Sequence, residues 1–166
     1  MKLRLPDSVT VNILSKNNDI KDPIIVRYKI KAFHEKIWKA LTDKNEMKRW
    51  YFDIPDFNLE IGKVFNFYEP GGSKKYHHQG EILEISPNKK LRHTWSYPEF
   101  SKEKTIVNWE LKPEGEETEV ILKHEGIDSF KELGESFTRE SFTEGWNAII
   151  GQSLKSYLEK KDTKNQ

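Results

Sequence analysis

Five histidines are the side chains best suited to acid–base chemistry or metal binding near neutral pH: His34, His77, His78, His93 and His124. The adjacent pair at 77 and 78 points to opposite faces if its segment is a strand, so it cannot hold one metal ion. Pairing the predicted strands around their turns places Leu83, His93, Val107 and His124 in approximately one row across the sheet. His93 and His124 are then two strands apart, a separation of about 10 Å. Metal ligands lie only about 2 Å from their ion. We therefore predict no metal site, and we place His93 and His124 in the lining of the fold, forming hydrogen bonds or contacting a ligand.

Glu81 is a candidate for holding a polar ligand end or acting as an acid, but its orientation depends on the strand register. If Leu83 and Ile85 face inward, as the apolar count favours, His77 and Glu81 face inward too. The proton affinity of a carboxylate in such an apolar pocket rises. If Ile82 faces inward instead, Glu81 lies in water. Both alternatives remain open, and Glu81 is kept among the candidate ligand-binding residues.

Other kinds of site are poorly supported. The 166 residues contain no cysteine, which excludes disulfides, thiolate nucleophiles and cysteine-bound zinc. No Ser-His-Asp order, nucleophile elbow or dinucleotide fingerprint is present, and we predict no cofactor. The 28 Lys and Arg residues balance 27 Asp and Glu residues, so charge gives no case for a nucleic-acid partner. No apolar run approaches the roughly 18 residues of a membrane span, and the first residues lack a secretion signal. A cytoplasmic location is therefore expected.

The periodicity of the sequence predicts the elements that position these side chains. Residues 24–31 alternate as a strand, and helical spacing follows at 34–41 and again at 43–50, where Asp43 and Glu46 form a capping box. Period-two segments separated by turns then predict an antiparallel meander. Its strands are expected at 62–69, 76–85, 91–95, 105–111 and 120–124. Helical spacing returns from about residue 136 to 160.

The last helix carries one apolar stripe, formed by Phe142, Trp146, Ile149, Ile150 and Tyr157 at about 100° per residue. A meander needs a cover for its inner face, and this helix is the only apolar cover long enough. A curved sheet gripping one helix often leaves a concave apolar space, where small molecules bind. The predicted lining of this cavity is Trp50, Phe65, Phe67, Glu81, His93, Trp95, Trp109, His124, Phe142, Trp146 and Ile149.

A series of motifs follows one another in a specific order and spacing. The run Ala32–Asp43 is followed by Met47–Tyr51, and strand and helix motifs come after it at 62–67, 80–87, 91–95, 120–124 and 144–146. In their order and spacing these motifs resemble the heat-shock-protein-90 ATPase activator homologue family, with the first two as its helix–helix start. The resemblance spans about residues 24–160 and implies an α+β fold of the START-like, SRPBCC or helix-grip class. In this fold a curved antiparallel sheet, with two short helices near the N-terminus, wraps around a long C-terminal helix.

The resemblance implies the fold more directly than the function. Members of this superfamily commonly hold lipids, hormones or polyketides in a central cavity. We expect residues 1–22 to be an arm or extra strand, residues 23–160 to be one START-like domain, and residues 161–166 to be a polar tail. The first functional hypothesis is non-catalytic binding of a small hydrophobic or aromatic molecule. The second is a protein-interaction domain with a chaperone partner, and the third is a cyclase or hydrolase. The chain is expected to be a monomer or a homodimer.

Overall fold

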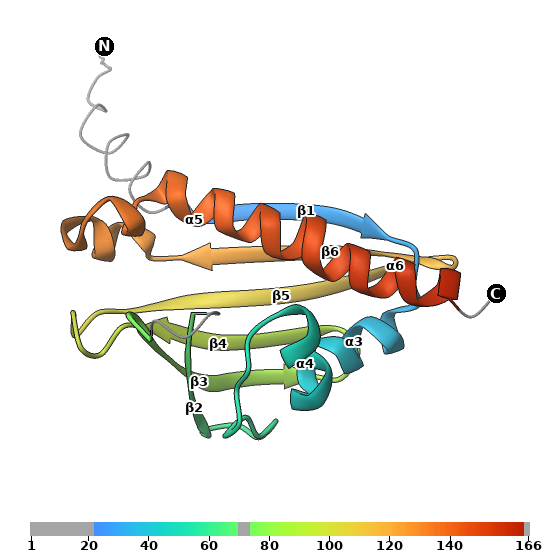
Figure 1. Cartoon of the computed structure of the whole chain (residues 1–166), viewed down its shortest axis with the longest axis horizontal. Coiled ribbons are helices and arrows are strands. Elements are labelled where there is room, and N and C mark those ends of the chain that lie inside the picture. Colours follow the sequence, from blue (N-terminus) through green and yellow to red (C-terminus); the bar gives the residue numbers. More distant parts are fainter. Residues whose placement is uncertain (1–21, 70–73, 165–166) are drawn as a thin grey trace, which may run out of the picture.

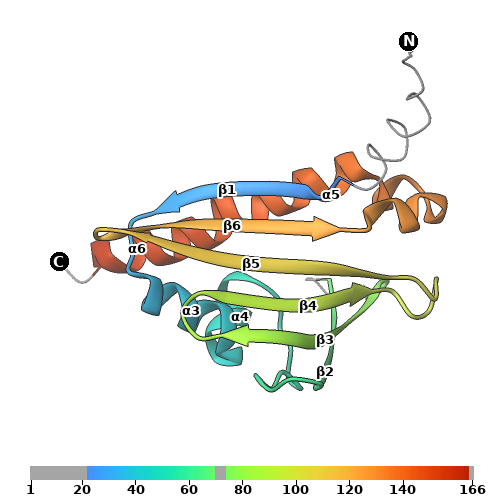
Figure 2. The same ribbon diagram turned by 180° about the vertical axis from the view of Figure 1, so that it is seen from behind.

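The computed structural model describes residues 22–69 and 74–164, which form an α+β fold with helices on one face of a sheet (Figures 1 and 2). The described strands form one antiparallel sheet of six, in the order β1-β6-β5-β4-β3-β2. Strands β2 to β6 are thus the predicted meander, and β1 pairs with β6. Their bounds are β1 (Ile24–Ile30), β2 (Val64–Tyr68), β3 (His77–Ser86), β4 (Lys90–Ser96), β5 (Lys104–Glu114) and β6 (Glu117–Glu125).

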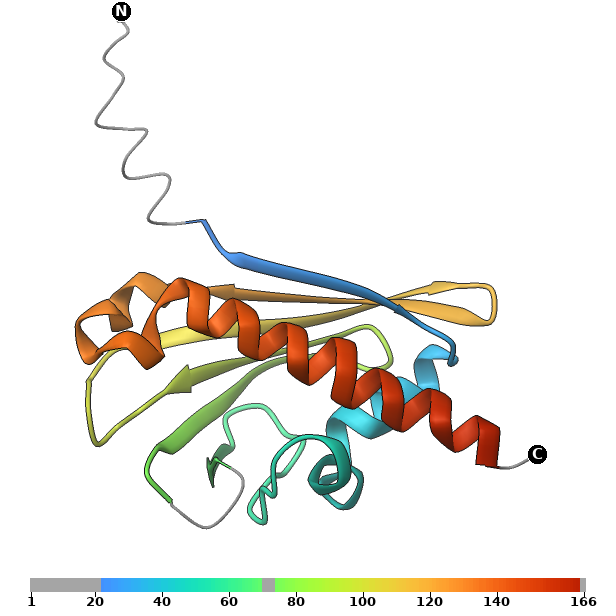
Figure 3. The same ribbon diagram turned by 45° about the horizontal axis from the view of Figure 1, so that its top comes forward.

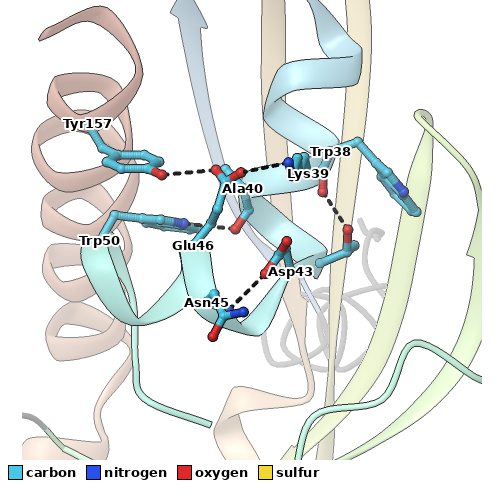
Figure 4. A network of polar contacts seen from close by, with 9 residues as sticks. Trp38, Lys39, Ala40, Asp43, Asn45, Glu46, Trp50 and Tyr157 are labelled. Carbon is cyan, nitrogen blue, oxygen red and sulfur yellow. Dashed lines mark hydrogen bonds and ion pairs between the residues drawn. The ribbon is translucent and has the colours of Figure 1, made fainter. Parts of the chain in front are cut away.

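Two short helices follow β1, as the spacing predicts: α3 (His34–Thr42) and α4 (Lys44–Trp50). The Asp43 carboxylate caps α4 by accepting a hydrogen bond from the Asn45 backbone N–H at 2.8 Å (Figure 4). The predicted capping box does not form, because the Asp43 N–H is used by the Lys39 carbonyl. Glu46 accepts instead from the Tyr157 hydroxyl at 2.9 Å. This hydrogen bond ties α4 to the C-terminal helix.

The C-terminal helix crosses the concave face of the sheet (Figure 3). It consists of α5 (Arg139–Trp146), the π-helical segment η3 (Asn147–Leu154) and α6 (Lys155–Lys164). Two 3-10 turns that the periodicity did not predict, η1 (Ile127–Leu133) and η2 (Glu135–Phe137), lead from β6 into it. The predicted 1–22 arm lies outside the described residues except for Asp22. No helix in the described ranges is long and apolar enough to cross a membrane.

The buried stripe of the C-terminal helix differs from the predicted one. Trp146, Ile150, Leu154 and Leu158, each four residues apart, are at most 2% exposed. Ile149 and Tyr157, predicted on the stripe, are only partly buried. In a regular α-helix every fourth residue drifts by about 40° around the axis. The wider turns of the π-helical segment reduce this drift and return every fourth residue to the sheet.

Two small residues let the C-terminal helix pack closely on its neighbours. A Cβ added at Gly151 would lie only 2.5 Å from Cζ of Tyr28 on β1. Glycine therefore allows the Tyr28 ring to lie against the helix backbone, where its hydroxyl donates to Asn147 Oδ1 at 2.7 Å. Ser153 donates a hydrogen bond to the Trp50 carbonyl at the end of α4. The helix is thus fixed to both the sheet edge and α4.

A β-bulge in β3 decides which of its side chains face the core. His93, Val107 and His124 pair in one row across β4, β5 and β6, as predicted. The partner of His93 in β3 is Ile82 rather than the predicted Leu83, and the pairing shifts between Ile82 and Glu84. The extra residue reverses the alternation. Ile82, before the bulge, and Ile85, after it, therefore both pack against the core.

The bulge corrects two predictions about polar side chains. Glu81 adjoins the fully buried Ile82 and so belongs to the outer face, where it is partly exposed. It does not line the interior. The same register turns His78 inward, 7% exposed, and leaves His77 partly buried with its Nε2 2.7 Å from Asn66 Oδ1. The count of apolar residues predicted the wrong face for Glu81 and His77 because it assumed that side chains alternate without interruption through residue 85.

Candidate functional site

Aromatic side chains fill the space between the sheet and the C-terminal helix. The Trp146 ring lies 5.2 Å from the Trp95 ring and 5.7 Å from the Trp109 ring, measured between centroids. The His124 ring is 5.8 Å from both Trp95 and Trp146. All four residues are at most 5% exposed. The predicted open cavity at this place is therefore wrong, because these large side chains occupy the volume that it needs.

A chain of hydrogen bonds fixes the protonation of His124. Trp146 Nε1–H donates to His124 Nδ1 at 3.0 Å, so Nδ1 carries a lone pair. The Thr105 hydroxyl donates its hydrogen to the Trp95 carbonyl at 2.9 Å. Its oxygen must therefore accept a hydrogen bond from His124 Nε2–H at 2.8 Å. His124 is thus held as the neutral Nε2–H tautomer. Burial lowers its pKa to about 3, with a further contribution from His93.

His93 is also held neutral. Its Nδ1–H donates to the Thr94 carbonyl at 2.8 Å, which leaves Nε2 as the acceptor nitrogen. Burial lowers its pKa to about 4, and the Thr94 carbonyl opposes this shift. His93 lines a small internal void of about 10 Å³ together with Tyr51, Phe65 and Trp109. This volume is at the lower limit for one water molecule.

An open cleft of about 540 Å³ lies between the end of α4 and β2. Aromatic rings of Tyr51, Phe52, Phe67 and Tyr68 form its apolar wall, and polar residues including Lys48, Asp53, Asn66 and Lys74 form the rest. Tyr51 lines both this cleft and the internal void. The volume falls within the roughly 300–1,000 Å³ of ordinary small-molecule sites. A second hollow of about 510 Å³, beside the start of β5 and the end of β6, has no aromatic lining, so the aromatic wall makes the cleft the candidate ligand site of the described chain.

The predicted site residues divide between these places. Trp95, Trp109, His124 and Trp146 form the filled interior, with Phe142 packed on His124 at 5.3 Å. Trp50 donates its indole N–H to the Ala40 carbonyl at 2.9 Å (Figure 4) and stacks on Tyr51. The remaining predicted residues are distributed as follows: Phe65 and His93 line the void, Phe67 lines the cleft, and Ile149 is partly buried on the C-terminal helix.

Residues 31–159 match the family model described as Activator of Hsp90 ATPase homolog 1-like protein. The chain belongs to this family. No curated protein matches the sequence. The match confirms the family resemblance, and the six-stranded sheet with its C-terminal helix confirms the helix-grip fold.

Several solved structures are similar in fold to this chain. PFC0360w, an HSP90 activator from Plasmodium falciparum, is 18% identical with a TM-score of 0.67, covering 83% of this chain and 96% of its own. The Aha1 dimer from Colwellia psychrerythraea is 25% identical with a TM-score of 0.63, covering 82% and 96%. DynU16, from the dynemicin biosynthetic locus, is 20% identical with a TM-score of 0.68. The match covers 83% of this chain but only 47% of DynU16, so the chain spans about half of that protein's length.

Three aromatic residues of this family member border the cleft or its inner wall and were not predicted. Tyr51 and Phe52 follow α4 in an irregular segment, where no periodicity assigns a face. His78 stacks on Phe67, with ring centroids 4.6 Å apart and an angle of 13° between planes. Pairing His78 with Phe67 across β2 and β3 was the signal that could have identified it. The two rings then share one face of the sheet.

Proposed function

We propose that the protein binds a small hydrophobic or aromatic molecule, without catalysis, in the cleft between α4 and β2. The observation that supports this proposal is the cleft volume of about 540 Å³ beside the rings of Tyr51, Phe52 and Phe67. Such rings give a planar apolar ligand a large contact area. This proposal moves the predicted ligand from the sheet–helix interface to the side of the sheet, and it keeps the predicted ligand class.

The hydrogen bonds of the buried histidines favour binding over the cyclase or hydrolase alternative. His124 uses both ring nitrogens in bonds to Trp146 and Thr105, and His93 uses Nδ1 in a bond to a carbonyl. A general base needs a lone pair that a substrate proton can reach. Both nitrogens of His124 are already used, and the buried His93 lines only a void of about 10 Å³, which is too small for a substrate.

A thermal-denaturation screen tests the binding proposal. Fatty acids, sterols and aromatic polyketides are mixed with the protein, and a true ligand at about 100 times its dissociation constant should add about 2.7 kcal/mol of stability. The substitution Phe67→Ala, in the cleft wall, should weaken the response. Phe33→Ala is the matched control, because Phe33 is 55% exposed and lies outside the cleft. If no compound shifts the transition, the proposal is wrong.

A chaperone partner is a second candidate, because apolar side chains gather on one exposed segment. Leu59, Ile61, Val64 and Tyr68, all in or just before the edge strand β2, are between 38% and 63% exposed. Exposed apolar patches of this kind mark interaction surfaces. The family match and the Plasmodium relative, an HSP90 activator, point to a chaperone of that class.

Mixing the protein with a heat-shock-protein-90 chaperone and measuring ATP hydrolysis tests this candidate. The protein should raise the ATPase rate, and the double substitution Ile61→Ser and Val64→Ser should abolish the increase. Ile25→Ser is the control, because Ile25 is also exposed, at 48%, but lies on β1 at the opposite edge of the sheet. An unchanged rate with the unsubstituted protein would exclude stimulation of that chaperone. A monomer or a homodimer remains expected, and the Colwellia Aha1 dimer favours the homodimer.

A further inference from the structure

Phe52 has two different environments. On its inner side the ring lies 4.5 Å from Tyr51 and 4.6 Å from Phe67, between centroids. It also reaches two rings of the sheet interior, His78 at 5.8 Å and Trp95 at 6.4 Å. On its outer side it lines the open cleft and is only partly buried. The Phe52 ring therefore separates the cleft from the aromatic interior.

Two buried polar atoms belong to the rings that Phe52 touches. The Tyr51 hydroxyl and His78 Nδ1 are inaccessible to solvent, and neither has a hydrogen-bond partner among the described residues. Most buried polar groups in folded proteins are paired, and an unpaired one is destabilising. The hydroxyl donor and the ring nitrogen thus belong to two rings that contact the same phenyl ring, which suggests that a polar group is missing among these rings.

We propose that Phe52 is a plug that occupies a ligand's place, and that a neutral hydroxyaromatic molecule displaces it. This inference rests on the proposed binding function of the cleft. The ligand ring lies where the Phe52 ring now packs, against Tyr51, Phe67 and His78. Its hydroxyl oxygen accepts from the Tyr51 hydroxyl and donates to His78 Nδ1. The ligand hydroxyl thus gives both unpaired atoms a hydrogen-bond partner, which the phenyl ring of Phe52 cannot provide.

The surroundings favour a neutral ligand over a carboxylate. The four rings around Phe52 carry no charge at neutral pH, since burial lowers the pKa of His78 to about 4 against the opposing effect of the Tyr76 and Phe67 backbone groups. The cleft lysines, Lys48 and Lys74, share the rim with Asp53 and Glu69. A carboxylate moved inward would lose its hydration without meeting a cation.

Phe52 can leave its position without disrupting a regular element. It lies in the segment between the end of α4 at Trp50 and the start of β2 at Val64. Its displacement therefore breaks no ladder of the sheet. Because the unliganded protein must expel this ring before binding, its apparent affinity is reduced by the fraction of molecules in which the site is open.

Calorimetric titration of three probes tests the plug and the ligand class. The probes are 2-naphthol, its methyl ether 2-methoxynaphthalene, and the anion 2-naphthoate. With the unsubstituted protein, 2-naphthol should bind most tightly. Phe52→Ala should bind 2-naphthol about tenfold more tightly, because the competing ring is gone. Tyr51→Phe should weaken 2-naphthol about three- to tenfold, the range expected for one neutral hydrogen bond.

Matched variants separate these effects from general ones. Tyr28→Phe removes a tyrosine hydroxyl from β1, at the edge of the sheet opposite the cleft, and Phe33→Ala removes an exposed ring elsewhere. Neither should change the affinity for 2-naphthol. Phe52→Leu replaces Phe52→Ala if the smaller side chain prevents folding, and it should give a smaller gain in affinity.

The outcomes distinguish this inference from the proposed function. Binding that Phe67→Ala weakens but Phe52→Ala does not strengthen would retain the cleft and overturn the plug. Equal affinity for 2-naphthoate and 2-naphthol would overturn the neutral ligand class. Binding that appears only after Phe52→Ala supports the plug. If no probe binds either protein, both the inference and the binding proposal for aromatic molecules fail.

Discussion

Acidification from pH 7 to pH 5 should lower the free energy of unfolding by up to about 2 kcal/mol for each of three buried histidines. Burial is the main cause in all three, and it lowers the pKa of His78 and His93 to about 4 and that of His124 to about 3. In the unfolded chain histidine titrates near pH 6.5. Between these values the unfolded state binds more protons, so acid favours unfolding. The stabilisation is complete above about pH 7 and falls as the pH decreases toward 4.

Urea denaturation at pH 7, 6 and 5 measures this effect. These pH values are all 5 or higher, a range in which ordinary carboxylates titrate little. His124→Gln should lower stability at pH 7, because the bonds to Trp146 and Thr105 are disturbed, and it should reduce the pH slope by about a third. His93→Gln should reduce the slope by a similar amount. A slope that neither substitution alters would show that these histidines do not control the acid response.

The strands and helices were predictable wherever local patterning agreed with the final packing. The row of His93, Val107 and His124 follows from alternation and short turns alone, and the structure confirms it. The capping residue Asp43 was equally evident. Such features depend on the period of two or 3.6 residues and on side chains near in sequence.

Two irregularities limited the prediction of faces. The bulge between Ile82 and Glu84 inserts one residue into β3, and period-two reasoning cannot detect it. It reversed the expected orientation of Glu81. The π-helical turns after Trp146 changed the buried stripe, so Leu154 replaced Ile149 on it. Both deviations depend on packing between distant segments.

The candidate site was the least predictable part. The expected cavity assumed that large side chains would surround a space, whereas Trp95, Trp109 and Trp146 fill it. The actual cleft is bordered by Tyr51 and Phe52, which follow α4 without periodic spacing. In an irregular segment no periodic spacing shows which way two aromatic side chains point. Their orientation follows only from the packing of this segment against the sheet.

Trp146→Ala should destabilise the fold by about 3–5 kcal/mol, the range for truncating a buried tryptophan. Trp146 is 2% exposed and packs on three aromatic neighbours, Trp95, Trp109 and His124. Its removal also leaves His124 Nδ1 without its donor. Urea denaturation at pH 7 measures the loss. Ile149→Ala, on the same helix but only partly buried, is the control and should cost clearly less.

A double-mutant cycle separates the hydrogen bond from the packing. Trp146→Phe keeps a ring in place but cannot donate to His124, so it should cost about 1–3 kcal/mol, the penalty for an unpaired buried acceptor. In the presence of His124→Leu the same change should cost less, because no acceptor remains, with a coupling of about 0.5–3 kcal/mol. Equal costs in both backgrounds would mean that the indole N–H contributes nothing through His124. If Trp146→Ala costs no more than Ile149→Ala, the rings do not fill the interior, and an internal cavity under the C-terminal helix becomes the better account of the ligand site.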